Sequence, residues 1–148
     1  MYVVFALLAL GCGAVLTAQV GSNTLLGRTL DNPYIPAAVN MVVGIALTSA
    51  LLLIAHKPWP AGAVVRSAPW WTWIAGGALG VVYLTANVLL APRLGAAALV
   101  GFVVTGQLLF AVMCDEFGWL GFDPHPASLW RYAGCLLMMA GVALIAKF

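Results

Sequence analysis

The chain has 148 residues, of which 64% are apolar and only 7% are charged, whereas soluble domains average about 45–50% apolar and about 25% charged residues. This composition excludes an ordinary soluble enzyme or binding domain and predicts an integral membrane protein embedded in the lipid bilayer. The net charge of +2 is small and scattered, so no nucleic-acid partner is expected.

Five apolar segments follow one another along the chain. A helix needs about 20 mainly apolar residues to cross the hydrocarbon core, and each segment is close to that length. We therefore expect an all-α protein with a single five-helix transmembrane domain covering residues 1–148. The expected helices are residues 2–20, 35–55, 70–90, 95–114 and 129–146.

The first segment begins at Tyr2 and has no Lys or Arg before it, as the n-region of a signal peptide would require. We expect it to be a spanning helix. A polar stretch, residues 19–24, follows its apolar part. If the helix continues past this point, Gln19 and Asn23 lie one turn apart on one face, while Gly21 and Ser22 permit a bend or local unwinding.

Proline and glycine mark the boundaries of the later segments. Asn32 and Pro33 break the chain before the second helix, and Pro36 suits a first helical turn. Residues 56–69 contain three prolines, which rules out a continuing helix. Residues 91–95 predict a short turn, and residues 117–126 predict a loop.

Further polar residues lie inside the expected helices. Asn40 lies one turn inside the second helix, and Asn87 and Tyr83 lie near the end of the third. Amides in a membrane either join helices, contributing about 0.6–2 kcal/mol each, or line a wet cavity. Because several cluster in one half of the membrane, we expect a polar cavity. The substrate-pathway candidates are Gln19, Gly21, Asn23, Asn40, Tyr83, Asn87, Thr105 and Gln107.

Small residues at helical spacing predict helix packing. Gly76 and Gly80 are four residues apart in the third segment, and Gly134 and Gly141 lie two turns apart in the last. Small residues allow helix backbones to approach closely in a membrane. We expect these four glycines to contact other helices rather than a ligand.

Charged residues are missing from the first three segments, so a central carboxylate for proton exchange has no candidate there. The acids nearest a spanning segment are Asp115 and Glu116, at the end of the fourth helix. A carboxylate held there is a candidate for proton coupling. The alternative is an ordinary interfacial end of a helix.

Reactive side chains form no recognisable set. The cysteines, Cys12, Cys114 and Cys135, are far apart, and each lies in an apolar run, so we expect buried free thiols. His56 and His125 lie in loops without a nucleophile or ligand at a catalytic or metal-binding spacing. We therefore expect no enzyme activity, no metal site and no cofactor.

Charge and aromatic residues bear on orientation. If the five segments alternate, each side of the membrane receives three Lys or Arg, so the positive-inside rule has no excess to act on. All six tryptophans fall on the N-terminal side, and an antiparallel pair would place a tryptophan belt on both faces. We expect dual insertion and an antiparallel ten-helix homodimer; the alternative is that the N-terminal amine or one deeper residue tips the balance. The charges are Lys57, Arg66 and Arg131 on the N-terminal side and Arg28, Arg93 and Lys147 on the other.

An ordered set of short motifs resembles the YdcZ family, half-size members of the drug/metabolite transporter (DMT) superfamily. The likeness covers nearly the whole chain and includes residues 19–23, 26–28, 32–33, 70–77, 91–97, 106–107, 115, 117–118, 134 and 141. The resemblance implies five helices per subunit, members found as dual-topology single genes, oppositely oriented pairs or ten-helix fusions, and transport of small molecules across a bacterial inner membrane. The essential first-helix glutamate of the more distant small multidrug resistance proteins has no counterpart here.

Together these patterns predict a secondary transporter or exporter of a small molecule that works by alternating access. One alternative is a dimeric passive channel or uniporter, because a pore needs only polar lining and a constriction. Another is a structural or accessory membrane subunit whose amides only join helices. Neither the substrate, the direction nor the coupling ion is readable from the residues.

Overall fold

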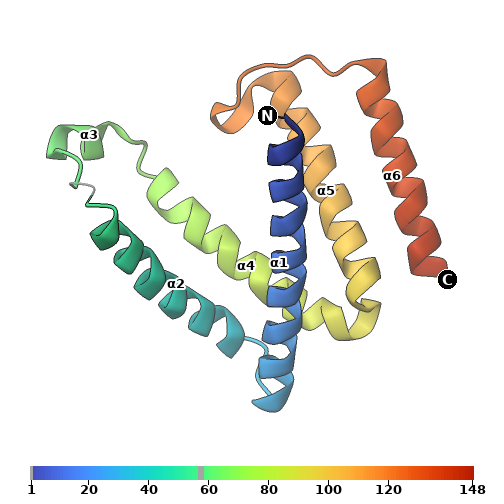
Figure 1. Cartoon of the computed structure of the whole chain (residues 1–148), viewed down its shortest axis with the longest axis horizontal. Helices are drawn as coiled ribbons and strands as arrows, with labels where there is room; N and C mark the ends of the chain where they lie inside the picture. The colour runs from blue at the N-terminus through green and yellow to red at the C-terminus, as the bar shows by residue number, and fades with distance from the viewer. Residues whose placement is uncertain (1, 57–58) are drawn as a thin grey trace. The chain divides into compact units, whose positions relative to one another are not determined.

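The computed structural model describes residues 2–56 and 59–148, and its regular secondary structure within these ranges is entirely helical. Lys57 and Pro58, which belong to the predicted charge count and loop, lie outside the described residues. Five helices are long and apolar enough to cross a membrane, which confirms the predicted helical membrane architecture (Figure 1). They are α1 (Tyr2–Thr29), α2 (Ile35–Ile54), α4 (Thr72–Leu94), α5 (Ala96–Phe117) and α6 (Leu129–Lys147).

Helix α1 is longer than expected, because it runs without interruption to Thr29 rather than ending near Val20. Two threonine hydroxyls of this stretch bond their own helix: the hydroxyl of Thr24 donates to the Val20 carbonyl and that of Thr29 to the Leu25 carbonyl. The polar stretch therefore neither ends nor unwinds the helix. At 28 residues, α1 is about 42 Å long.

The junction between α4 and α5 is tighter than the expected five-residue turn. Helix α4 continues to Leu94 with Pro92 inside it, and α5 begins at Ala96. Only Gly95 separates them, with a φ of +77° that glycine adopts without steric cost. The end predicted at residue 90 was therefore too early: Pro92 has no N–H to bond the Val88 carbonyl, but the helix continues two residues beyond it.

Two short helices lie in the loops. Helix α3 (Gly62–Ser67) occupies part of the connection after α2, and the 3₁₀ helix η1 (Trp119–Gly121) follows α5. Gly118 caps α5 in the left-handed conformation, with φ at +64°, and its N–H donates to the Cys114 carbonyl.

The chain forms two compact units, and α4 passes from the first into the second. In the first unit (Met1–Leu89), α1 packs against α2 and against the end of α4. Gly27 makes the close approach: a Cβ there would lie 2.9 Å from Cγ1 of Val88 and 3.4 Å from Cγ of Pro36. The buried apolar residues of this unit belong to the C-terminal halves of α1 and α4 and the first turn of α2; they are Val20, Pro36, Ala37, Leu84 and Val88.

In the second unit (Leu90–Phe148), α5 and α6 run side by side and are joined by the loop that contains η1 (Figure 1). A Cβ at Gly101 would lie 3.0 Å from both methyl carbons of Val142, so the two helices meet closely there. Cys114 and Cys135 are buried free thiols, as expected. Cys12 in the first unit is also free but exposed, because no residue from Val3 to Ala18 is buried, so its predicted burial was wrong.

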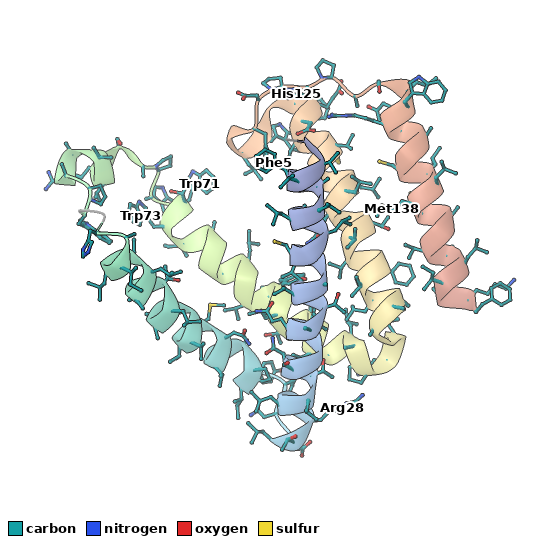
Figure 2. The ribbon with its side chains drawn as sticks, viewed as in Figure 1. Phe5, Arg28, Trp71, Trp73, His125 and Met138 are labelled. Carbon is teal, nitrogen blue, oxygen red and sulfur yellow. The ribbon has the colours of Figure 1, made fainter. Side chains whose placement is uncertain are left out.

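The six tryptophans are all exposed. They lie just after α2, around the start of α4, in η1 and at the start of α6. Figure 2 shows Trp71 and Trp73 where the chain enters α4, while Arg28 lies at the end of α1. Exposed indole rings at such helix ends suit a membrane–water interface.

Candidate functional site

Three side-chain amides of α1 and α2 join in one hydrogen-bonded group, here named the amide cluster (Gln19, Asn23 and Asn40). Nε2 of Gln19 donates to Oδ1 of Asn40 at 3.0 Å, and Nδ2 of Asn40 donates to Oδ1 of Asn23 at 2.6 Å. Nδ2 of Asn40 also donates to the Pro36 carbonyl at 2.8 Å. Gln19 and Asn23 both reach Asn40 because residues four apart share one face of a helix.

The cluster leaves part of its hydrogen-bonding capacity open. Asn23 is only 7% exposed, whereas Gln19 and Asn40 are partly exposed. Asn40 uses both its amide oxygen and its amide nitrogen. By contrast, Nδ2 of Asn23 and Oε1 of Gln19 have no hydrogen-bond partner among the described residues. One amide NH2 group and one amide oxygen therefore remain for water or a ligand.

An open groove of about 410 Å³ lies along one face of α2, and we name it the α2 groove. Asn40 belongs both to this groove and to the amide cluster, so the two features are continuous. The lining residues are Asn40, Met41, Gly44, Ile45, Thr48, Ser49 and Leu52. The sequence analysis did not single out Thr48 and Ser49, although Asn40, Gly44 and Thr48 recur at four-residue spacing on one helix face.

Helix α4 carries the next two predicted residues. Asn87 is 4% exposed, and its Nδ2 donates to the carbonyl of Tyr83 one turn earlier at 3.0 Å. Tyr83 itself is partly exposed. Neither side chain is hydrogen-bonded to the amide cluster in the described part of the chain, but Asn87 is next to Val88, which contacts Gly27 of α1.

The remaining predicted residues separate into buried and exposed positions. On α5, Thr105 is buried and its hydroxyl donates to the Gly101 carbonyl at 2.8 Å, which satisfies it within its own helix. Gln107, in the middle of α5, is exposed and makes no hydrogen bond to a described residue. Gly21 is exposed on α1, with open space beside it.

The two acids at the end of α5 both have partners in the second unit. Asp115 forms an ion pair with Arg131 of α6, with 3.0 Å between Oδ2 and the guanidinium nitrogen. Oε2 of Glu116 accepts the backbone N–H of Ala127, and the carbonyl of Asp115 accepts that of His125. Together these bonds attach the loop after α5 and the start of α6 to the end of α5.

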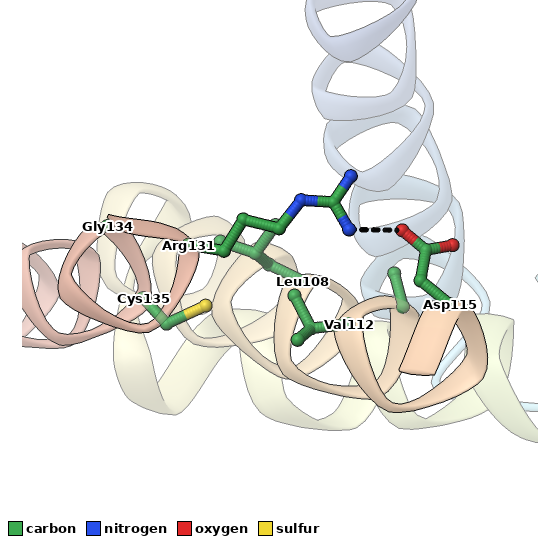
Figure 3. Close-up of a pocket in the computed structure, with 7 residues that line it drawn as sticks. Leu108, Val112, Asp115, Arg131, Gly134 and Cys135 are labelled. Carbon is green, nitrogen blue, oxygen red and sulfur yellow. Dashed lines mark hydrogen bonds and ion pairs between the residues drawn. The ribbon is translucent and has the colours of Figure 1, made fainter. Parts of the chain in front are cut away.

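The ion pair lies at a second opening, a cleft of about 370 Å³ between α5 and α6 (Figure 3). Figure 3 shows the Arg131 guanidinium directed toward Asp115, with Leu108 and Val112 beside them. The cleft is otherwise apolar, apart from the thiol of Cys135. Gly134, predicted to pack against a helix, lines this cleft.

The predicted packing glycines have unequal surroundings. A Cβ at Gly80 would lie 3.9 Å from Cε of Met41, an ordinary contact between α4 and α2. Gly76, Gly134 and Gly141 have open space beside them within their own units. The closest approaches between helices fall instead at Gly27 and Gly101. Gly101 was not singled out because its partner Val142 is not a small residue.

Comparison with known proteins places the chain in a family. The profile of the family described as "Putative inner membrane exporter, YdcZ" matches residues 4–144. The chain is 31% identical over 144 residues to the "Inner membrane protein YdcZ" of Escherichia coli (strain K12), covering 95% of this chain and 92% of the relative. No solved structure matches the chain. The chain therefore belongs to the YdcZ family, confirming the resemblance, and is a multi-pass inner membrane protein of a transporter family.

Proposed function

We propose that this protein is a secondary transporter that exports a small molecule across the inner membrane, working by alternating access as a dual-topology antiparallel homodimer. The observation that carries the proposal is the amide cluster opening into the α2 groove. Sites for small molecules are concave and mostly apolar, with a few polar groups that orient the ligand. The α2 groove has this composition, and Asn40 connects it to the cluster.

Hydrogen bonding among the amides is also what a purely structural role would require. The cluster differs from simple helix joining because Nδ2 of Asn23 and Oε1 of Gln19 remain without partners among the described residues. In an apolar medium such groups are stabilised when water or a ligand bonds them. This supports a wet pathway next to α1 and α2.

The antiparallel dimer is supported by the balanced Lys and Arg count, the one-sided tryptophans and Gln107. An exposed amide in the middle of a spanning helix is costly against lipid, because hydrocarbon offers it no hydrogen bond. A second copy in the opposite orientation would place another Gln107 at the same depth. The amide cluster would then occur once near each face, giving a two-fold polar pathway.

Transport itself can be tested in proteoliposomes with a defined probe mixture of sugars and polyols, amino acids, organic cations and organic acids. Accumulation under an imposed proton gradient is measured by mass spectrometry for the wild type and for Asn40→Leu. The matched control is Thr17→Val, because the hydroxyl of Thr17 bonds only the Gly13 carbonyl of its own helix.

We expect at least one compound to accumulate with the wild type and with Thr17→Val but not with Asn40→Leu. Equal contents in wild-type and protein-free vesicles would contradict the transporter proposal. Equilibration without accumulation would favour the passive channel instead.

A further inference from the structure

Two hydroxyl groups of α2, on Thr48 and Ser49, lack the hydrogen bond that several threonines make to their own helix. Ser22 on α1 and Thr85 on α4 also make none to a described residue, but only Thr48 and Ser49 line the α2 groove. Thr24, Thr29 and Thr105 each donate to the carbonyl four residues earlier in their own helix. Thr48 and Ser49 make no hydrogen bond to any described residue, although both lie well inside a membrane-spanning helix. A hydroxyl in hydrocarbon without a partner is unfavourable, so a ligand that hydrogen-bonds these two groups gains free energy.

Both hydroxyls line the α2 groove, and the helix leaves space in front of them. Apart from its chain neighbours and the nearby backbone of α2 itself, no described heavy atom lies within 4 Å of a Cβ built on Gly44, one turn before Thr48. Asn40 lies one turn before Gly44, so an amide and two hydroxyls line the same groove. Met41, Ile45 and Leu52 supply its apolar surface. The groove thus offers hydrogen bonds along an otherwise apolar wall.

The groove carries no charge. None of its seven lining residues is ionisable, and the sequence of α2 from Ile35 to Ile54 contains no Asp, Glu, Lys, Arg or His. An ion moved from water to a low-dielectric site is strongly destabilised unless an opposite charge or several oriented dipoles compensate it. The site therefore favours a neutral ligand over a cation or an anion.

We infer that the α2 groove is the substrate site of the proposed transporter and that its substrate is a small uncharged molecule bearing hydroxyl or amide groups, such as a polyol. The inference rests on the proposed function, which it deepens by naming the substrate class. Thr48 and Ser49 hydrogen-bond the polar groups of the ligand, and Met41, Ile45 and Leu52 contact its carbon chain. At about 410 Å³, the groove is at the lower end of the range of small-molecule sites.

The test measures ligand protection rather than transport, so it can fail independently of the transport assay. A cysteine is introduced by Gly44→Cys in a Cys12→Ala background of the full-length protein in liposomes. Cys114 and Cys135 are retained because they are buried. The labelling rate of the Cys12→Ala parent, which has no introduced cysteine, is subtracted as their background. The labelling rate by a water-soluble thiol reagent is measured with erythritol, tetramethylammonium or propionate at equal millimolar concentration. A second reporter, Leu52→Cys, which keeps both hydroxyls, replaces the first if Gly44→Cys does not fold.

We expect erythritol to slow labelling several-fold, while tetramethylammonium and propionate leave it unchanged. Thr48→Val combined with Ser49→Ala abolishes this protection in the Gly44→Cys reporter, whereas the matched Thr17→Val change preserves it. Protection by either ion but not by erythritol would overturn the inference, as would no protection by any probe. A cysteine that no reagent reaches would assign the groove to the interface with a second copy and would also overturn it.

Discussion

Nδ2 of Asn40 on α2 donates a 2.6 Å hydrogen bond to Oδ1 of Asn23 on α1. The same Asn40 amide accepts a bond from Gln19 and donates to the Pro36 carbonyl. The side chain of Asn40 thus links α2 to α1 and also bonds the first turn of its own helix. The α2 groove begins at this residue, so the stability of the helix pair and the chemistry of the proposed site depend on the same amide.

Asn40→Leu should therefore destabilise the α1–α2 pair. The substitution removes the bonds to Gln19, Asn23 and the Pro36 carbonyl, and hydrogen bonds between membrane helices contribute about 0.6–2 kcal/mol each. We expect a lower midpoint of thermal unfolding in detergent, whereas Thr17→Val leaves it unchanged. An unaltered midpoint for Asn40→Leu would show that the cluster does not hold the two helices together.

Gly101→Ala should weaken the packing of α5 on α6. The added Cβ would lie 3.0 Å from both methyl carbons of Val142, and the stiff valine side chain has little freedom to move away. We expect a destabilisation of about 1–3 kcal/mol, measured by reversible unfolding. Gly106→Ala is the control on the same helix, because that site has open space and alanine has the higher helix propensity.

Val142→Ala should restore part of the stability lost in Gly101→Ala, because it removes the two methyl groups that the new Cβ approaches. If the double variant is no more stable than Gly101→Ala alone, the loss does not arise from this contact.

Gln107→Cys should crosslink to its own copy if the dimer is antiparallel. In such a dimer the two Gln107 residues lie at the same depth, near the middle of the membrane. Ala96 is exposed and lies on nearly the same face eleven residues earlier, about 16.5 Å along α5, so its two copies would be about 33 Å apart along the membrane normal. With a short bifunctional thiol reagent, Gln107→Cys gives dimers on a gel and Ala96→Cys does not. Strong crosslinking of Ala96→Cys would indicate parallel subunits.

Removing one positive charge from either side of the membrane should shift the orientation of insertion, in a direction that depends on the side. Arg66 and Arg93 belong to opposite sides in the predicted topology, and cytoplasmic loops retain Lys and Arg. Arg66→Gln raises the fraction of chains with a cytoplasmic C-terminus, whereas Arg93→Gln lowers it, as measured by paired C-terminal reporters active on only one side. A C-terminus on one side only, in the wild type and both variants, would contradict dual insertion.

Asp115 and Glu116 of α5 should mainly stabilise the loop that follows this helix. The Asp115–Arg131 pair is partly exposed, with side-chain accessibilities of 30% and 43%, and such pairs contribute about 0.2–1 kcal/mol. Glu116→Leu, which removes the acceptor of the Ala127 N–H, should accelerate amide exchange in residues 118–128 more than Asp115→Asn does.

Asp123→Asn is the control for both acids, because its carboxylate has no partner among the described residues. We expect gradient-driven export to persist in Asp115→Asn, since this carboxylate is already engaged by Arg131. Loss of gradient-driven export in Asp115→Asn but not in Asp123→Asn would instead identify Asp115 as the proton-coupling group.

The sequence predicted the helices well because the length of an apolar run is a local property, set by the thickness of the membrane. It predicted two boundaries poorly. The polar stretch after Gln19 looked like a helix end, but Thr24 and Thr29 bond their own backbone and α1 continues. Pro92 looked like a helix stop, yet it lies in the last turn of α4.

The amide cluster was only partly predictable. The four-residue spacing of Gln19 and Asn23 placed them on one face of α1, but their bonds to Asn40 depend on how α2 packs against that face. Gly101 escaped prediction for the same reason, since its closeness to Val142 is a property of two helices and not of one segment.

By itself, the sequence determined that this is a five-helix inner membrane protein of the YdcZ family, because membrane crossing and family motifs depend on local composition and ordered residues. Tertiary structure alone decided which polar groups meet and which remain without partners. Asn40 is satisfied by α1, whereas Thr48, Ser49 and Gln107 are not bonded to described residues. The physical reason is that a hydrogen bond requires two groups within about 3 Å, and only helix packing brings residues distant in sequence to that separation.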